Sequence, residues 1–107
     1  MSPTYQVVYL PEAEAALEKT ATYITEHDGP RRAAHWLRRM LESINKLETM
    51  PSLFAERGVR GGRKIRAKPV MSHLAYYVID EPRRMVFLID IAAGAQGSKR
   101  DKYEGDA

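Results

Sequence analysis

The hydrophobic and polar positions of this chain change their spacing twice. Residues 5–10 are apolar and rich in β-branched and aromatic side chains, which predicts a first strand. Residues 11–27 and 30–49 then carry apolar side chains at three- and four-residue spacing, which predicts two amphipathic helices. Pro11 suits the first position of a helix, and Asp28-Gly29-Pro30 supplies a terminator followed by a new start.

Each predicted helix has one apolar stripe. The stripes consist of Leu10, Ala13, Leu17, Ala21 and Ile24 in the first helix, and of Ala33, Leu37, Met40, Ile44 and Leu47, widened by Trp36 and Leu41, in the second. Because the connection is only about three residues long, the two helices must lie antiparallel, so residues 11–49 are predicted to form a helical hairpin. The stripes need an apolar partner, and the strands predicted after the hairpin are the only candidate.

A basic strand is predicted next, after a loop that covers residues 52–62. In residues 63–68 the side chains alternate between two faces, so that Lys64, Arg66 and Lys68 share one face of the strand. Pro69 is expected to end this strand.

Two apolar strands are predicted at residues 71–79 and 85–91, joined by the turn Asp80-Glu-Pro-Arg-Arg84. The elements together predict an α+β fold: an N-terminal strand, an antiparallel two-helix hairpin, and a mainly antiparallel sheet of three C-terminal strands with the helices packed on one face. The length of 107 residues suits a single domain. We assign residues 1–92 to this domain and predict that residues 93–107, which are small, polar and charged, form a flexible tail.

Charge is distributed unevenly along the chain. The net charge is +3, but residues 1–56 hold six basic and eight acidic side chains (−2), whereas residues 57–107 hold eleven and six (+5). Six cations and no acid lie in residues 57–68: Arg57, Arg60, Arg63, Lys64, Arg66 and Lys68. This density favours an anionic partner, either nucleic acid or an acidic polypeptide, and we predict these six as partner-binding residues. The alternative is a strand edge that is kept soluble by its cations.

The composition narrows the possible classes. Without cysteine the chain has no disulfide and no thiolate metal site, which fits a reducing cytosol, and we expect a cytoplasmic protein. No apolar run approaches the ~18 residues that span a membrane, and the first residues do not have a signal-peptide pattern. His27, His35 and His73 do not have ligand spacing, so we predict neither a metal site nor a cofactor.

Cations alone offer one catalytic chemistry. Cleavage of RNA through its 2′-hydroxyl needs an oriented attacking oxygen, a proton acceptor and stabilisation of the phosphorane charge, and clustered Lys and Arg can supply the last of these. The candidates for such a site are Lys64, Arg66 and His73, joined by a late Arg or Tyr at Arg100 or Tyr103.

The order of these elements resembles the RelE/ParE superfamily of bacterial toxins over residues 5–92. The resemblance rests on Leu10-Pro-Glu-Ala-Glu14, Tyr23-Ile24, Gly29-Pro30-Arg-Arg-Ala-Ala34, Leu47-Glu-Thr-Met-Pro51, Gly58-Val-Arg60 and Ser72-His-Leu-Ala-Tyr-Tyr-Val-Ile-Asp80. Members are toxins of type II toxin–antitoxin pairs, and the C-terminal segment of the antitoxin wraps and neutralises the toxin. The resemblance therefore implies a cognate antitoxin with an acidic or amphipathic C-terminal segment, held by the basic half of the chain in a hetero-oligomer.

Two functional branches follow from this resemblance. The RelE-like branch cleaves mRNA in the ribosomal A site, and Lys64 and Arg66 occupy its basic-strand positions. However, His73 stands where that branch usually has an Arg, and Ile89-Asp-Ile-Ala-Ala-Gly94 does not carry the catalytic Arg or His expected after the last strand. Arg100 and Tyr103 substitute only if the tail folds back.

The ParE-like branch inhibits DNA gyrase and is not known for catalysis. The tight hairpin of two long helices and Gly58-Val-Arg60 are closer to this branch, although Ala93-Gly-Ala-Gln96 replaces its usual basic ending. We therefore expect a ParE-like toxin that inhibits gyrase through protein contacts and is not an enzyme, with a basic binding face formed by Arg60, Arg63, Lys64 and Arg66. The alternatives are a RelE-like, ribosome-dependent endoribonuclease and an inactive module that only binds an antitoxin.

Overall fold

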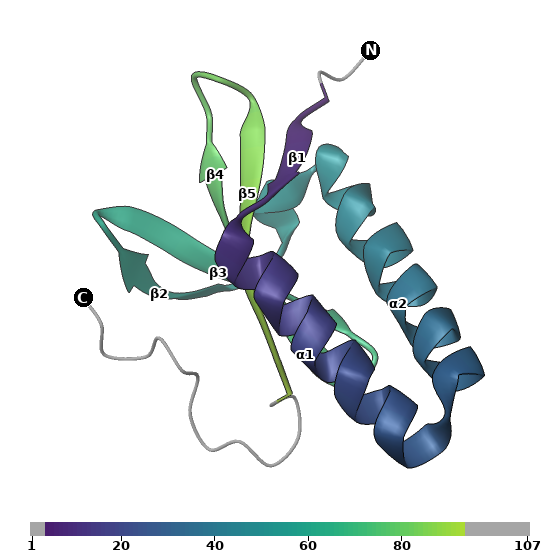
Figure 1. Ribbon diagram of the computed structural model, residues 1–107. Coiled ribbons are helices and arrows are strands. Elements are labelled where there is room, and N and C mark those ends of the chain that lie inside the picture. The colour runs from purple at the N-terminus through teal and green to yellow at the C-terminus, as the bar shows by residue number, and fades with distance from the viewer. Residues whose placement is uncertain (1–3, 94–107) are drawn as a thin grey trace.

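The computed structural model describes residues 4–93 and contains one sheet and two long helices (Figure 1). In chain order the elements are β1 (Gln6–Tyr9), α1 (Pro11–Asp28), α2 (Pro30–Asn45), the 3₁₀ turns η1 (Lys46–Glu48) and η2 (Pro51–Leu53), β2 (Glu56–Arg60), β3 (Arg63–Val70), β4 (His73–Asp80) and β5 (Met85–Ala93). The sheet order is β1-β5-β4-β3-β2, in which β1 is parallel to β5 and the other neighbours are antiparallel. The predicted α+β fold class is therefore confirmed.

A single residue, Gly29, connects the two helices of the hairpin. The N–H of Gly29 donates to the carbonyl of Thr25 (3.0 Å) at the end of α1, and the carbonyl of Gly29 accepts from the N–H of Ala33 (3.2 Å) at the start of α2. Gly29 has φ 98° and ψ 159°, a conformation that residues with a Cβ rarely adopt. This turn makes the helices antiparallel, as predicted. However, α2 ends at Asn45, earlier than predicted, and the chain continues through η1.

The sheet has one strand more than the three predicted after the helices. The additional strand is β2, which lies inside the predicted loop 52–62 and pairs with β3. It lies at the edge of the sheet, where backbone pairing suffices, and its sequence Glu-Arg-Gly-Val-Arg does not show apolar alternation. A bulge between Glu56 and Gly58 further interrupts the period of two.

The expectation that Pro69 ends the basic strand is wrong, because β3 continues to Val70. Strand β2 pairs only with residues 63–66, so Pro69 has a strand neighbour on one side alone among the described residues. A proline is tolerated at such a local edge because it need not donate a hydrogen bond there.

The core lies between the helices and one face of the sheet. Figure 1 shows both helices on the same side of the sheet. The buried apolar side chains of this layer are Ala13 and Leu17 of α1, Trp36, Met40 and Ile44 of α2, Leu47 of η1, and Val70, Ala75, Tyr77, Val86, Leu88 and Ile91 of the sheet. The predicted stripes therefore face the sheet, except that Leu10 packs against side chains on the opposite face. A second apolar cluster occupies the opposite face and contains Ile65, Ala67, Leu74, Tyr76, Val78 and Ile89.

Strand β1 and the end of α2 are tied together by a side-chain hydrogen bond. The hydroxyl of Tyr9 donates to Oδ1 of Asn45 (2.7 Å), and burial raises the pKa of Tyr9 to about 12. No helix in residues 4–93 is long and apolar enough to cross a membrane. The predicted tail, from residue 94 onward, lies outside the described residues.

We predict that Gly29→Ala lowers the free energy of unfolding by about 1–3 kcal/mol, because alanine would be forced into a backbone region that is almost restricted to glycine. Urea denaturation followed by circular dichroism measures the change. Asp28→Ala, at the exposed neighbouring position, is the control and should change the free energy by less than about 0.5 kcal/mol. An equal effect of both substitutions would show that the backbone of Gly29 is not what the hairpin requires.

Candidate functional site

Three basic side chains line one face of β3, as the alternation predicts. Lys64, Arg66 and Lys68, which we call the β3 cation row, lie on the side of the sheet that faces the helices, while Ile65 and Ala67 are buried on the opposite face. All three cations have partners within the chain. These partners determine what chemistry is available to the row.

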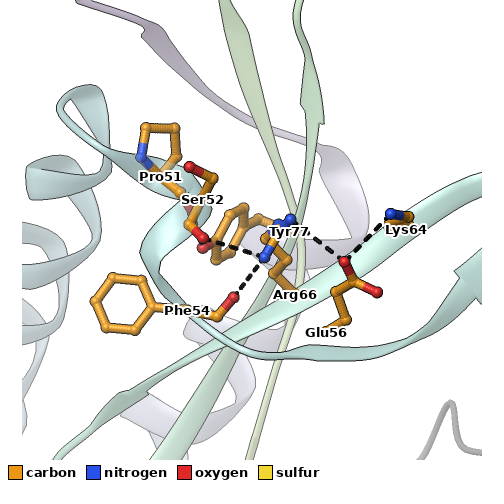
Figure 2. Close-up of polar contacts among 7 residues, drawn as sticks. All are labelled: Pro51, Ser52, Phe54, Glu56, Lys64, Arg66 and Tyr77. Carbon is orange, nitrogen blue, oxygen red and sulfur yellow. Dashed lines mark hydrogen bonds and ion pairs between the residues drawn. The ribbon is translucent and has the colours of Figure 1, made fainter.

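Arg66 is the central residue of the row and is only 20% exposed. Its Nη1 donates to the carbonyls of Phe54 (2.7 Å) and Ser52 (3.2 Å), and its Nη2 lies 3.5 Å from Oε2 of Glu56. Figure 2 shows the guanidinium between the two carbonyls and the carboxylate. Both terminal nitrogens of Arg66 are thus committed to the segment that leads into β2.

Tyr77 fastens the same segment from β4. Its hydroxyl donates to the carbonyl of Pro51 (Figure 2), and Pro51 is itself fully buried. Tyr77 lies opposite Arg66 in the β3–β4 register. Burial raises the pKa of Tyr77 well above its ordinary value, and the nearby charge of Arg66 offsets only part of this effect. The phenol is therefore a neutral hydrogen-bond donor at physiological pH.

Lys68 joins β3 to the end of α2. Its ammonium lies 2.6 Å from the carbonyl of Ser43, in the last turn of the helix, and 5.4 Å from the centre of the Phe54 ring. A cation at this position stabilises the negative end of the helix dipole. Burial lowers the pKa of Lys68, and the neighbouring charge of Lys46 lowers it further.

Lys64 is the exposed member of the row. Its ammonium lies 3.3 Å from Oε2 of Glu56, the oxygen that Arg66 also approaches, and its side chain is 67% exposed. The β3 cation row as a whole therefore fastens the connection between α2 and β2 to the sheet.

The other predicted partner-binding cations lie elsewhere. Arg60 pairs with Glu12 at the start of α1 (3.1 Å), and Arg63 lies 3.7 Å from Asp80 at the end of β4. Arg57 is exposed on β2. The six predicted cations consequently do not form one continuous face, because Arg60 and Arg63 lie around a cleft that the β3 cation row does not line.

This cleft, which we call the arginine cleft, has a volume of about 480 Å³. Arg60, Arg63 and Arg83 lie around it, and its apolar lining comes from Leu10, Val78, Phe87 and Ile89. Asp80 is buried here at 5% exposure, with Nε of Arg83 at 3.7 Å and the N–H of Arg83 donating to it at 3.3 Å. Sequence reasoning did not assign a role to Asp80 or Arg83, although an acid at the end of an apolar strand was a visible signal.

The structure does not bring the ribonuclease candidates together. His73 lies opposite Val70, whereas Arg66 lies opposite Tyr77. Val70 lies four residues along β3 from Arg66, a distance of roughly 13 Å. The His73 ring packs against Trp36 (5.4 Å between centroids), and its Nδ1 is buried without a hydrogen-bond partner in residues 4–93. Arg100 and Tyr103 lie outside the described residues.

Metal ligands do not gather in the described part of the chain. Among residues 4–93 there is no group of three or more His, Asp or Glu side chains that could hold a metal ion.

Comparison with solved structures identifies the class of fold. The chain is similar to a chromosomal ParDE toxin–antitoxin system from P. aeruginosa, with a TM-score of 0.71 and 15% identity over 86% of this chain and 98% of the other. It also resembles the RelBE2 toxin–antitoxin complex from Mycobacterium tuberculosis (TM-score 0.60, 17% identity, 90% and 98% covered) and the archaeal RelE–RelB complex from Pyrococcus horikoshii OT3 (0.62, 16%, 88% and 99%). The fold is that of the RelE/ParE superfamily.

Comparison with family models identifies the family. Residues 7–97 match the family described as ParE toxin of type II toxin-antitoxin system, parDE. A search of curated protein sequences finds no significant match. Since the family model covers most of the chain, the protein belongs to the ParE toxin family and is the toxin component of a type II toxin–antitoxin system.

We predict that Arg66→Met lowers the free energy of unfolding by about 2–3 kcal/mol, because two backbone carbonyls lose a charged donor. Lys64→Met is the matched control: it removes the same charge from the same strand, but at an exposed ion pair worth less than about 1 kcal/mol. Urea denaturation of both variants measures the difference. Equal losses of stability would contradict the structural role of Arg66.

We also predict an acid-dependent loss of stability that originates at His73. Burial lowers the pKa of His73 below its ordinary 6.5, so the unfolded chain binds a proton at a higher pH than the folded protein does. The contribution of neutral His73 to the free energy of unfolding is fully present above about pH 6.5. It declines as the pH falls from there through the folded-state pKa. His73 shares its cleft with Lys19 and Tyr23 of α1 and with Asp90 of β5.

Denaturation curves recorded between neutral and acidic pH test this origin. His73→Gln should flatten the decline, whereas His27→Gln, at an exposed position on α1, should leave it unchanged. A decline of the same steepness in His73→Gln would assign the effect to other groups.

Proposed function

We propose that this toxin acts by inhibiting DNA gyrase through protein contacts and is not a ribonuclease. The observation that carries the proposal is the commitment of Arg66 to the carbonyls of Ser52 and Phe54. A guanidinium that stabilises a phosphorane must present its donors to the reacting phosphate, whereas both terminal nitrogens of Arg66 already have acceptors. Reorienting them would leave two backbone carbonyls without their donor.

The remaining members of the ribonuclease set add little to such chemistry. His73 lies roughly 13 Å along the strand from Arg66. Lys68, which is not one of the ribonuclease candidates, is held at the end of α2. Among the candidates in residues 4–93, Lys64 alone is exposed, and a single cation supplies neither a proton acceptor nor an orienting group. Membership in the ParE toxin family agrees with a target reached through protein contacts.

The arginine cleft is the surface that we assign to protein partners. It combines apolar side chains with three surrounding guanidinium groups, so it suits a polypeptide segment that alternates apolar and acidic residues. We propose that a cognate antitoxin presents such a segment and thereby neutralises the toxin, in a hetero-oligomer formed in the cytoplasm. The solved neighbours support this partner, since each belongs to a toxin–antitoxin complex or system.

The proposal predicts that the purified full-length chain inhibits supercoiling by DNA gyrase at micromolar concentration and leaves mRNA intact on purified ribosomes. Arg63→Gln should raise the half-inhibitory concentration about tenfold, because it removes a cation from the cleft. Lys19→Gln removes the same charge from the exposed surface of α1 and should leave inhibition unchanged.

Two results would contradict this proposal. Unaffected supercoiling at micromolar excess of folded protein would rule out gyrase as the target. Ribosome-dependent mRNA cuts that disappear in Lys64→Ala would instead assign the chain to the RelE-like mode of action.

A further inference from the structure

The outward surface of α2 is strongly basic. At 3.6 residues per turn, seven exposed residues fall within about one third of the helix circumference. This surface, which we call the α2 basic face, consists of Arg31, Arg32, His35, Arg38, Arg39 and Glu42 of α2, continued by Lys46, the first residue of η1. The buried residues Ala33, Trp36, Met40 and Ile44 lie on the opposite side, against the core. The α2 basic face thus contains five formal cations and one acid.

The arginines of this face are not used by the fold. Within residues 4–93, Arg31, Arg32, Arg38 and Arg39 form neither an ion pair nor a side-chain hydrogen bond. The cations of β3, in contrast, all have intramolecular partners. The net charge of residues 1–56 gives no indication of this surface, because the five acidic residues of α1 cancel the four arginines of α2.

We propose that the α2 basic face binds the phosphate backbone of duplex DNA. The sixteen residues of α2 extend for about 24 Å, and the two arginine pairs are separated by seven residues, about 10.5 Å along the axis. Duplex DNA presents a negative charge about every 1.7 Å, so a rigid row of unpaired cations meets a rigid row of phosphates. Charge complementarity along a straight helix is the basis of the assignment.

The composition of the face disfavours other polyanions. An acidic protein partner would need an apolar centre with aromatic anchors, and the exposed residues of α2 supply neither. Single-stranded RNA is recognised largely by stacking on aromatic side chains, and His35 is the only ring on this face. Duplex RNA has a narrow major groove that a helix does not enter, whereas the major groove of DNA accommodates one.

This inference goes beyond the proposed function. The DNA-binding assay contains neither gyrase nor an antitoxin. Absence of DNA binding would therefore not contradict gyrase inhibition, and absence of gyrase inhibition would not contradict DNA binding. If both hold, the toxin would reach gyrase on DNA and contact both components.

Fluorescence anisotropy of a labelled duplex of about 20 base pairs, titrated with the full-length chain at several salt concentrations, tests the proposal. Four phosphate contacts predict a slope of about −3.6 for log K against log salt concentration. The combined variant R31Q/R32Q/R38Q/R39Q should bring the slope close to zero and weaken binding at low salt more than tenfold.

The matched control is R60Q/R63Q/K64Q/R83Q, which removes four exposed cations that lie outside α2 and changes the net charge equally; their partners are Glu12, Glu56 and the buried Asp80. It should retain the slope of the unmodified chain. Glu42→Gln should tighten binding about threefold at low salt, because it removes the one acid of the α2 basic face. This gain cannot arise from a variant that fails to fold.

Several outcomes would overturn the proposal. Equal losses in the two fourfold variants would indicate that net charge alone drives binding. A slope near zero for the unmodified chain, or unchanged affinity in Glu42→Gln, would show that the α2 basic face does not contact phosphates. Single-stranded or duplex RNA bound as tightly as DNA would overturn the choice of duplex DNA.

Discussion

The fold depends on holding the connection between α2 and the sheet in place. This connection passes through Met50, which has a left-handed backbone (φ 51°, ψ 50°) that costs ~1–2 kcal/mol in a residue with a Cβ. The carbonyls of the residues that follow accept their hydrogen bonds from side chains of the sheet, chiefly from Arg66 and Tyr77. Tyr77 holds the buried Pro51, and Lys68, from the same row as Arg66, binds the carbonyl of Ser43 at the end of α2. The same group of side-chain hydrogen bonds from the sheet therefore holds both the end of α2 and the segment that leads into β2.

The basic residues of β3 and α2 differ in whether they have partners within the described part of the chain. The cations of β3 serve the architecture, although sequence resemblance places two of them at positions that belong to catalysis in the RelE-like branch. The arginines of α2 have no architectural partner in residues 4–93 and remain available to a ligand. The hydrogen bonds that the carbonyls of Ser52 and Phe54 accept from Arg66 give this residue of the basic strand a structural role.

The sequence allowed much of the fold to be predicted, because periodicity reports which side of an element is buried. The hairpin, the two central strands and the alternation of Lys64, Arg66 and Lys68 follow from spacing alone. Strand β2 was missed because an edge strand with a bulge pairs through its backbone and needs no apolar period. The acceptors of Arg66 could not be foreseen, since loop carbonyls have no sequence signature. Summing charge over half the chain also hid the basic surface of α2 behind the acids of α1.

The most direct test of this account is the state of Arg66 in solution. Proton–nitrogen NMR spectra of the ¹⁵N-labelled full-length chain resolve guanidinium groups whose rotation is restricted. The account predicts separate, slowly exchanging Nη resonances for Arg66, absent from the spectrum of Arg66→Met, while the arginines of α2 give averaged signals. Averaged, rapidly exchanging Arg66 signals like those of α2 would show that the guanidinium is not committed to the backbone, and would return the basic strand to the list of possible active sites.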